Sequence, residues 1–220
     1  MLWVQLDRAT PSAVLGDAAP VMQGPDTTHF SVLDREGNRV AATLSINYPF
    51  GACLTPPGTG VLLNDEMDDF SIKPGTPNAY GLVGAEANAV APGKRPLSSM
   101  TPTFVENADG VAILGTPGGS RIITMVLLAV LDMVEENRPQ SWVSRPRFHH
   151  QYLPDVVQFE PGAFDRVVVE GLTARGHRLT ALDGPYGNMQ AIYWDKKDGR
   201  VYAASDPRGS GAAQVGPSKE

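Results

Sequence analysis

The chain has 220 residues, of which 42% are apolar and 19% are charged, and its formal net charge at pH 7 is −6. These values predict a soluble globular domain with a sizeable core. Lys and Arg are scattered along the chain, which argues against nucleic acids or anionic membranes as partners. The single cysteine, Cys53, excludes an intrachain disulfide framework and a cysteine-rich zinc site, and we expect it to pack as a small hydrophobic side chain.

The first 26 residues differ in composition from the rest of the chain. They are rich in Ala, Pro, Gly and Asp, with prolines at positions 11, 20 and 25, which predicts an extended or loosely ordered segment. They lack the basic start and the unbroken apolar stretch of a secretory signal. The pattern changes at Thr27.

Two hairpins are predicted from alternating residues and turn signals. Residues 29–34 and 39–47 form the first, joined by a polar turn that contains Gly37, and residues 101–107 and 111–115 form the second. The stretch 51–95 between them is rich in Gly, Pro and Asn and has few periodic segments. Irregular chain of this length is typical of binding loops or a lid.

Helices and further strands follow the second hairpin. The longest apolar run, residues 122–134, is shorter than the roughly 20 residues that a membrane span needs. It is apolar around most of its circumference, so we expect a helix sandwiched between two layers. A second helix is expected over 163–175, and strands over 177–183, 189–195 and 200–206. These elements predict an α+β sandwich with layered helices.

Thr27 is a candidate nucleophile. A threonine that cleavage makes N-terminal can use its own α-amine to activate its hydroxyl. An α-amino group titrates at about 7.7–8.0, which suits a general base near neutral pH. Threonine at the start of a strand is also common for its β-propensity alone, so the local sequence leaves both interpretations open.

Other motifs allow similar alternatives. The glycines in PGGSR, residues 117–121, would let backbone amides form an oxyanion hole, and a tight turn explains them equally well. The four carboxylates of LNDEMDD, residues 63–69, could bind a metal, hold an ammonium group or face water. The two serines of PLSSM, residues 96–100, are typical of a local hydrogen-bonding turn. His149 and His150 lack the spacing of a zinc hydrolase, so we expect a packed or partly exposed pair rather than a metal site.

Seven motifs in order and spacing resemble the small subunit of gamma-glutamyltransferases, a family of N-terminal-nucleophile hydrolases. They run from Thr27 to about Gly209 and read DTTHFSV, LSIN, LLNDEMDDFS, GKRPLSSM, GTPGGSRIIT, PRFHHQYLPD and ASDPR. The upstream RATPSAVLG resembles the end of the family's large subunit. The resemblance implies a four-layer αββα sandwich, incomplete in this chain, with a large-subunit tail at 1–26 and the small catalytic subunit at 27–220.

The resemblance also implies an activity. The family is made as one precursor that cuts itself before the nucleophilic threonine, which implies cleavage between Asp26 and Thr27. The Thr27 hydroxyl would then take the γ-glutamyl group of glutathione or a related amide and pass it to water, an amino acid or a peptide. The implied partner is the large subunit of the same precursor, and no metal or organic cofactor is implied. The family is periplasmic or extracellular, which implies the same location here.

Matching positions imply the catalytic roles. Gly118 and Gly119 match the family's oxyanion hole, and Ser45 stands where the family has a threonine that supports the nucleophile. The lost methyl group is expected to loosen the rotamer of this hydroxyl, because β-branching stiffens the first side-chain torsion. Tyr80 resembles the tip of a lid that shields the site from water.

Matching positions also imply the donor contacts. Ser98 and Ser99 match hydroxyls that bind the donor α-carboxylate, while Asn47, Glu66 and Asp69 match residues that hold its α-amino group. The family's large subunit adds an arginine for the α-carboxylate and half of the sandwich, and nothing in this sequence replaces them.

Two other interpretations are considered. A glutaryl acylase of the cephalosporin type shares the nucleophile and the oxyanion hole, but Asp69 and the long lid argue against it. The second interpretation is a non-catalytic fragment, or a subunit that gains activity only with a partner. A half-sandwich of this kind should leave an apolar patch of more than roughly a few hundred Å² uncovered.

Overall fold

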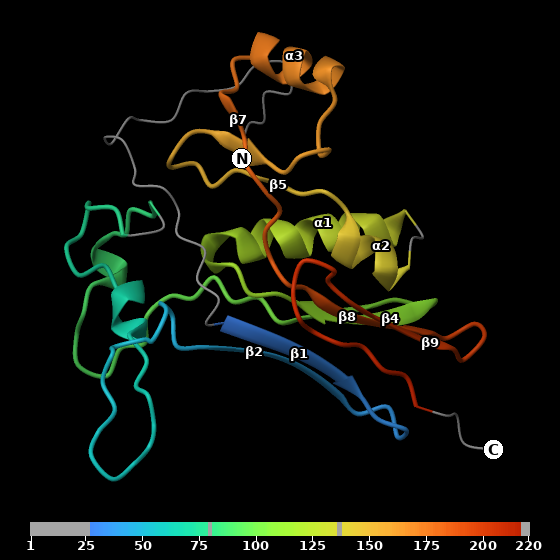
Figure 1. Ribbon diagram of the computed structural model, residues 1–220, viewed down its shortest axis with the longest axis horizontal. Helices are drawn as coiled ribbons and strands as arrows, with labels where there is room; N and C mark the ends of the chain where they lie inside the picture. The colour runs from blue at the N-terminus through green and yellow to red at the C-terminus, as the bar shows by residue number, and fades with distance from the viewer. Residues whose placement is uncertain (1–26, 79–80, 136–137, 217–220) are drawn as a thin grey trace.

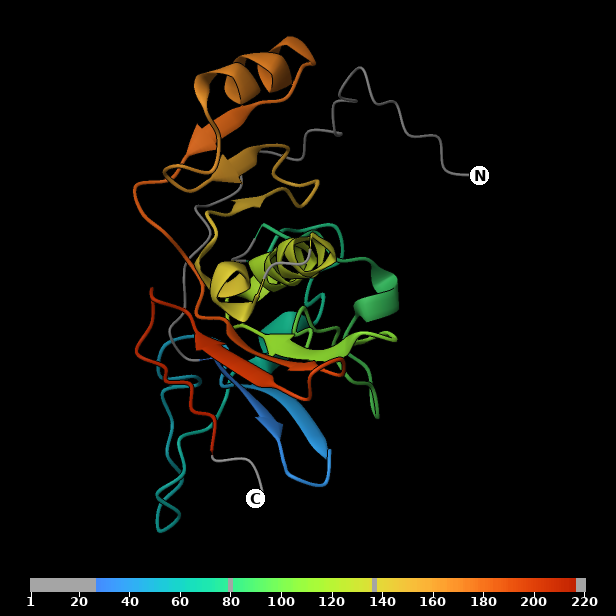
Figure 2. The ribbon, with the colours of Figure 1, turned by 90° about the vertical axis from the view of Figure 1, so that its right-hand side faces the viewer.

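The computed structural model describes residues 27–78, 81–135 and 138–216. Figure 1 shows two layers of β-structure stacked beneath a pair of helices, with a smaller sheet and a third helix above them. The same order of layers is visible after the 90° turn in Figure 2. The arrangement confirms the predicted α+β class. No helix in these ranges is long and apolar enough to cross a membrane.

The lowest layer is an antiparallel hairpin of β1 (Thr27–Leu33) and β2 (Arg39–Ser45), as predicted. Its turn is closed by Asp34, whose carboxylate accepts a hydrogen bond from the Asn38 backbone N–H at 2.8 Å. Gly37 has a φ of 87° in this turn, a conformation that favours glycine. These local contacts set the register of the whole hairpin.

The second layer is a four-stranded antiparallel sheet in the order β3-β4-β8-β9. Its strands are β3 (Thr103–Glu106), β4 (Gly110–Gly115), β8 (Gln190–Asp195) and β9 (Val201–Ser205). Every residue of β4 is buried, because the hairpin covers one face of this strand and the helices cover the other.

His29 lies buried between these two sheets. Its Nδ1 is 2.8 Å from Thr43 Oγ1, and its Nε2 is 3.1 Å from Ser31 Oγ. Burial lowers the pKa of His29 to about 4, so the ring is neutral at pH 7. A Cβ on Gly115 would stand 2.3 Å from the ring Cε1. The glycine at the end of β4 therefore makes room for the imidazole.

The third layer consists of two helices. The first, α1 (Ile122–Val134), has the predicted bounds. The second, α2 (Pro139–Ser144), was not predicted, although it begins with a proline in its first turn, where that residue is favoured. Between the helices and the central sheet lies the main core, which comprises Ala112, Leu114, Ile122, Met125, Val126, Ala129, Trp142, Val143, Tyr186, Met189, Ala191 and Ala204.

Helix α1 packs on the central sheet and contacts β5 near its first turn, but the rest of its outer side is not covered by the described residues. The expectation that two layers sandwich the helix is therefore met only at that end. Four apolar side chains on its outer side are 48–73% exposed: Ile123, Leu127, Leu131 and Val134. The outer face of the hairpin is similarly bare, with exposed fractions of 44–52% at Phe30, Val32, Val40 and Leu44. No described helix covers that face, so three of the four implied layers are present.

The segment 51–95 is irregular, as predicted. Among its described residues are two short 3-10 helices, η1 (Glu66–Asp69) and η2 (Glu86–Asn88). Cys53 lies in this segment with an exposed side chain and a φ of 53°. The prediction that it packs as a small hydrophobic residue is therefore wrong, because its loop lies on the surface.

The smaller sheet lies beside helix α3 (Arg166–Ala174), which falls within the predicted range. Its strands are β5 (Phe148–His149), β6 (Val157–Phe159) and β7 (Leu179–Ala181), with β6 and β7 parallel. The first two were not predicted, because segments of two and three residues are too short to show an alternating pattern.

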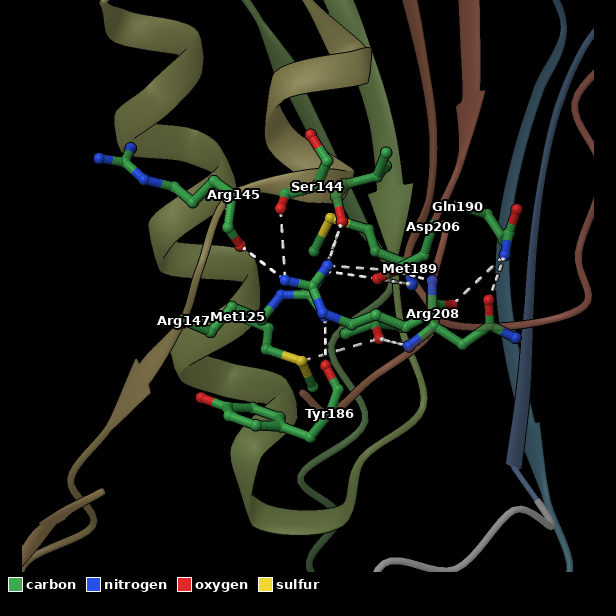
Figure 3. A network of polar contacts seen from close by, with 12 residues as sticks. Met125, Ser144, Arg145, Arg147, Tyr186, Met189, Gln190, Asp206 and Arg208 are labelled. Carbon is green, nitrogen blue, oxygen red and sulfur yellow. Dashed lines mark hydrogen bonds and ion pairs between the residues drawn. The ribbon is translucent and has the colours of Figure 1, made fainter. Parts of the chain in front are cut away.

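A buried ionic network joins the smaller sheet to the rest of the molecule (Figure 3). Arg147 Nη2 lies 2.6 Å from Asp206 Oδ2, and the two side chains are 2% and 0% exposed. Arg208 lies 2.7 Å from Glu160 and 3.1 Å from Asp206. Two guanidinium groups thus balance two carboxylates in a region where an unpaired charge would be costly.

Backbone groups satisfy the remaining hydrogen-bonding capacity of this network. Arg147 donates to the carbonyl oxygens of Val143 and Tyr186. Glu160 accepts from the Arg147 N–H at 2.9 Å, and Asp206 accepts from the Met189 N–H at 3.0 Å. The network therefore connects the end of α2, the start of β5 and the end of β9.

Breaking this network should destabilise the fold strongly. Arg147→Met keeps much of the side-chain volume but leaves Asp206 and Glu160 with one guanidinium between them. The expected loss is about 3–5 kcal/mol in the free energy of unfolding, measured by urea titration of the chain. The control is Arg166→Met, whose side chain is 88% exposed and pairs only with Glu170. Its unfolding midpoint should not change. Equal effects of the two substitutions would show that the network is not structural.

Candidate active site

The candidate nucleophile stands at the first residue of β1, opposite the last residue of β2. The hairpin register pairs Thr27 with Ser45, and their hydroxyl oxygens are 2.7 Å apart. Ser45 Oγ also accepts a hydrogen bond from the Asn47 backbone N–H at 2.8 Å. This second contact restrains the serine rotamer, which partly replaces the stiffness that a threonine methyl group would give.

The two glycines predicted as an oxyanion hole form a turn between β4 and α1. Gly118 has a φ of 143° and Gly119 a φ of 57°, and both values favour glycine. A Cβ on Gly118 would also stand 2.5 Å from Met125 Cε. The turn continues as η3 (Gly119–Arg121) directly into α1. Both positions therefore favour glycine for backbone reasons, and at Gly118 a larger side chain would also have to displace the end of Met125.

The acidic loop folds against the end of the hairpin. Asn47 is buried, and its Nδ2 donates to the Asp65 carbonyl oxygen at 3.4 Å. The short helix η1 follows and carries Glu66 and Asp69. Burial, together with the negative charge of Glu66 and a hydrogen bond to it, raises the pKa of Asp69 to about 6.

Glu66 lies beside Asp69, and part of its carboxylate is also buried. Its Oε1 is buried and has no hydrogen-bond partner among the described residues. A buried carboxylate oxygen without a partner is costly. Together with the crowded charge of Asp69, it marks a place where a cationic or hydrogen-bonding ligand would stabilise the protein.

The serine pair approaches from the segment before β3. Ser98 Oγ accepts a hydrogen bond from the Met100 backbone N–H at 3.1 Å, which is the local turn contact expected of such a serine. Its hydroxyl proton is not used in that bond and can point toward an anion. Ser99 is half-buried beside it.

These residues converge on one small pocket of about 40 Å³. Among the candidate residues, the pocket is lined by Thr27, Ser45, Asn47, Glu66, Asp69, Ser98, Ser99 and Gly119. Gly118 is not among the lining residues. Asp26 and Tyr80 lie outside the described residues. The described lining includes two carboxylates and no Lys or Arg, so it is suited to a cation and lacks a charged partner for an anion.

A larger cavity of about 810 Å³ adjoins the pocket and shares Asp69, Ser98, Ser99 and Ser120 with it. His149 and His150 line this cavity. His149 is buried and His150 is exposed beside Asp155, so the pair is packed and partly exposed, as predicted. Within the described ranges, no group of three or more His, Cys, Asp or Glu side chains is arranged to hold a metal ion.

Sequence reasoning assigned no role to two residues near the site, Ser120 and Gln151. Ser120 lines both cavities, and it is tied to Gln151 and, through Gln151, to His149. The position of Ser120 directly after the two glycines was the only local signal. The contact with Gln151 spans 31 residues, and no sequence pattern reveals it.

Comparison with known proteins identifies relatives over nearly the whole chain. The family model for gamma-glutamyltranspeptidase matches residues 4–216. A glutathione hydrolase proenzyme from Escherichia coli is 46% identical over 210 residues, which cover 93% of this chain and 35% of that protein. The chain therefore spans about a third of the length of this relative.

Solved structures agree with the sequence comparison. Gamma-glutamyltranspeptidase from Pseudomonas nitroreducens, complexed with L-DON, is 43% identical and superposes with a TM-score of 0.78 over 86% of this chain and 100% of that one. A cephalosporin acylase from Bacillus halodurans, 23% identical over 86% of this chain and 34% of that one, has a TM-score of 0.65, a likeness that shows the shared N-terminal-nucleophile fold alone. On this sequence match and this fold, the chain belongs to the gamma-glutamyltranspeptidase family.

Proposed function

We propose that this chain carries the catalytic site of an enzyme that transfers or hydrolyses γ-glutamyl groups of glutathione and related amides, with Thr27 as nucleophile. The observation that supports this most directly is the Thr27 hydroxyl, which lies 2.7 Å from Ser45 Oγ in a pocket shared with Gly119 and Asp69. A hydroxyl, a supporting hydroxyl and a glycine turn are the parts that acyl transfer requires.

The first step is self-cleavage, in keeping with the proenzyme name of the Escherichia coli relative. Thr27 Oγ attacks the carbonyl carbon of Asp26, the peptide C–N bond breaks, and the α-amine of Thr27 leaves. The resulting ester is hydrolysed by water, which releases the Asp26 carboxylate and restores the Thr27 hydroxyl. The free α-amine is then positioned to act as general base for the same hydroxyl.

The second step is transfer of the donor's acyl group. Thr27 Oγ attacks the γ-carbonyl carbon and passes its proton to the α-amine, which protonates the leaving amine. The negative charge of the tetrahedral intermediate faces the Gly118–Gly119 turn. Water or the amine of an amino acid or peptide then attacks the γ-glutamyl ester and regenerates Thr27. Two successive displacements of this kind give ping-pong kinetics.

The α-ammonium and α-carboxylate of the donor share one carbon atom, so they would bind to neighbouring parts of the same pocket. Asp69 and Glu66 would face the α-ammonium. The ammonium would give the buried Glu66 oxygen a hydrogen-bond partner and would stabilise the charged form of Asp69. Asn47 adds a polar contact at this end. Ser98 and Ser99 donate hydroxyl hydrogen bonds to the α-carboxylate. Glutaryl amides lack the ammonium group, and the carboxylates therefore disfavour the acylase alternative.

The rest of the family precursor is the proposed partner. The bare outer faces of the hairpin and of α1 require apolar cover, and the α-carboxylate requires a cation that the described pocket lining does not supply. We therefore expect the catalytic site in this chain to work only when that partner is bound. A periplasmic or extracellular location is proposed from family membership.

Thr27→Ala should abolish both self-cleavage and turnover, because it removes the attacking hydroxyl. Denaturing gels and intact mass of the full precursor should show only uncut chain. Thr27→Ser keeps the hydroxyl, so it should still cut, and Thr28→Ala is the matched neighbour that should cut normally. Continued cleavage before residue 27 in Thr27→Ala would rule out this nucleophile.

Asp69→Asn tests the ammonium contact in the complete, self-cleaved enzyme that carries this sequence. For γ-glutamyl-p-nitroanilide, kcat/KM should fall by roughly 10²- to 10³-fold, the usual effect of truncating a buried charge pair. For glutaryl-p-nitroanilide, the already low kcat/KM should change little, because this substrate carries no ammonium group. Equal losses on both substrates would mean that Asp69 acts through folding or maturation instead.

The raised pKa of Asp69 predicts a specific pH profile. Asp69 must be ionised to hold the ammonium, and its pKa of about 6 means that this charge is lost as pH falls through that value. As pH falls through about 7.7–8.0, the Thr27 amine becomes protonated and can no longer act as general base, which lowers activity separately. The logarithm of kcat/KM for the γ-glutamyl donor should therefore steepen from a slope of about one to about two below pH 6. In Asp69→Asn the slope should stay near one, and an unchanged steepening there would assign the second ionisation to another group.

A further inference from the structure

The glycine turn beside the nucleophile is held from behind by a chain of side-chain hydrogen bonds. Ser120 directly follows Gly119 and is only 5% exposed. Its Oγ donates to Gln151 Oε1 at 2.6 Å. The same oxygen of Gln151 lies 2.7 Å from His149 Nε2, and His149 Nδ1 lies 2.8 Å from Thr124 Oγ1. The chain of contacts starts at the turn and returns to α1.

Counting protons fixes the direction of the two bonds to Gln151. An amide oxygen can only accept, so both Ser120 and His149 Nε2 donate to Gln151. Burial lowers the pKa of His149, although the bond to Gln151 opposes this and the nearby charges of Arg121 and His150 reinforce it, so the ring is neutral at pH 7. With His149 Nδ1 unprotonated, the single hydroxyl proton of Thr124 lies between two acceptors, His149 Nδ1 at 2.8 Å and the Arg121 carbonyl oxygen at 3.0 Å. Gln151 Nε2 donates to the Leu153 carbonyl oxygen at 2.9 Å, which fixes the orientation of the amide.

The 3-10 helix η3 comprises only Gly119–Arg121. Two backbone hydrogen bonds close it, from the Arg121 N–H to the Gly118 carbonyl oxygen at 3.2 Å and from the Ile122 N–H to the Gly119 carbonyl oxygen. Glycine backbones are the most conformationally free in the chain. Anchoring Ser120 to a separate segment therefore removes freedom from the two amides that precede it.

We propose that Gln151 and His149 are positioning residues that hold the Gly118–Gly119 turn in place through Ser120. The proposal rests on the proposed function, in which this turn stabilises the negative charge of the tetrahedral intermediate. Neither residue touches the reacting atoms. Their effect is transmitted by the Ser120 hydroxyl, and it matters most when the intermediate forms, because a displaced donor stabilises that state less.

The experiment compares three variants with the unmodified, complete enzyme that carries this sequence. Gln151→Met keeps the length of the side chain but removes the acceptor, and Ser120→Ala removes the donor. Each should lower kcat for γ-glutamyl-p-nitroanilide by about 10- to 100-fold while KM stays within about two-fold. The double variant should be no worse than Ser120→Ala, because both changes break the same link. Gln140→Met, on the exposed side of α2, is the matched control and should retain full kcat.

A second readout does not depend on catalysis. Hydrogen–deuterium exchange of the peptide covering residues 117–121 should be faster in Gln151→Met and Ser120→Ala than in the unmodified protein or in Gln140→Met. Unchanged exchange, or multiplicative losses of kcat in the double variant, would overturn the proposal. If exchange is faster in the two variants but the unmodified enzyme has no γ-glutamyl activity, the proposed function is refuted, while the positioning of the turn through Ser120 and Gln151 is supported.

Discussion

The register of one hairpin is the constraint on which the site depends. Thr27 and Ser45 face each other only because the turn at Asp34 pairs the strands residue by residue over their full length. A slip by one residue would turn His29 toward solvent and Phe30 toward the central sheet that contains β4. His29, fitted against Gly115, therefore acts as a check on the register. The position of the nucleophile therefore depends on contacts at the opposite end of the hairpin.

Elements with strong local signals could be predicted from the sequence. Alternating residues and turn signals located the hairpins over 29–47 and 101–115, and the apolar run 122–134 predicted a helix with the observed bounds. Segments that tertiary contacts impose could not be predicted. Strand β5 exists because it pairs with β6, and β6 also pairs with β7. The Arg147–Asp206 pair joins residues 59 positions apart. Cys53 was misplaced because apolar character does not reveal which loops reach the surface.

The candidate site shows the same division. Each local motif had a second, structural explanation, and for Ser98 the turn contact is present alongside the pocket position. Family resemblance supplied the roles. The fold brings most of the residues that were assigned those roles to one pocket, although they are far apart in the sequence. Gly118 lies outside the lining, and the anchor through Gln151 had no sequence signal. The roles of individual residues stay predictions until the variants are measured.

The charges of the pocket and the exposed apolar faces both call for groups that the described residues do not supply. The described pocket places Glu66 and Asp69 together, with one buried oxygen unpaired and one pKa raised, and its lining contains no cationic side chain. An amino acid donor would satisfy the two carboxylates through its ammonium, but its carboxylate would then meet only hydroxyl groups. Serine hydroxyls bind a carboxylate less strongly than a bidentate guanidinium does. The bare apolar faces of the hairpin and α1 require cover at the same time. A single polypeptide that packs on those faces and extends a cation toward Ser98 and Ser99 would meet both needs, so assembly and donor binding should be coupled.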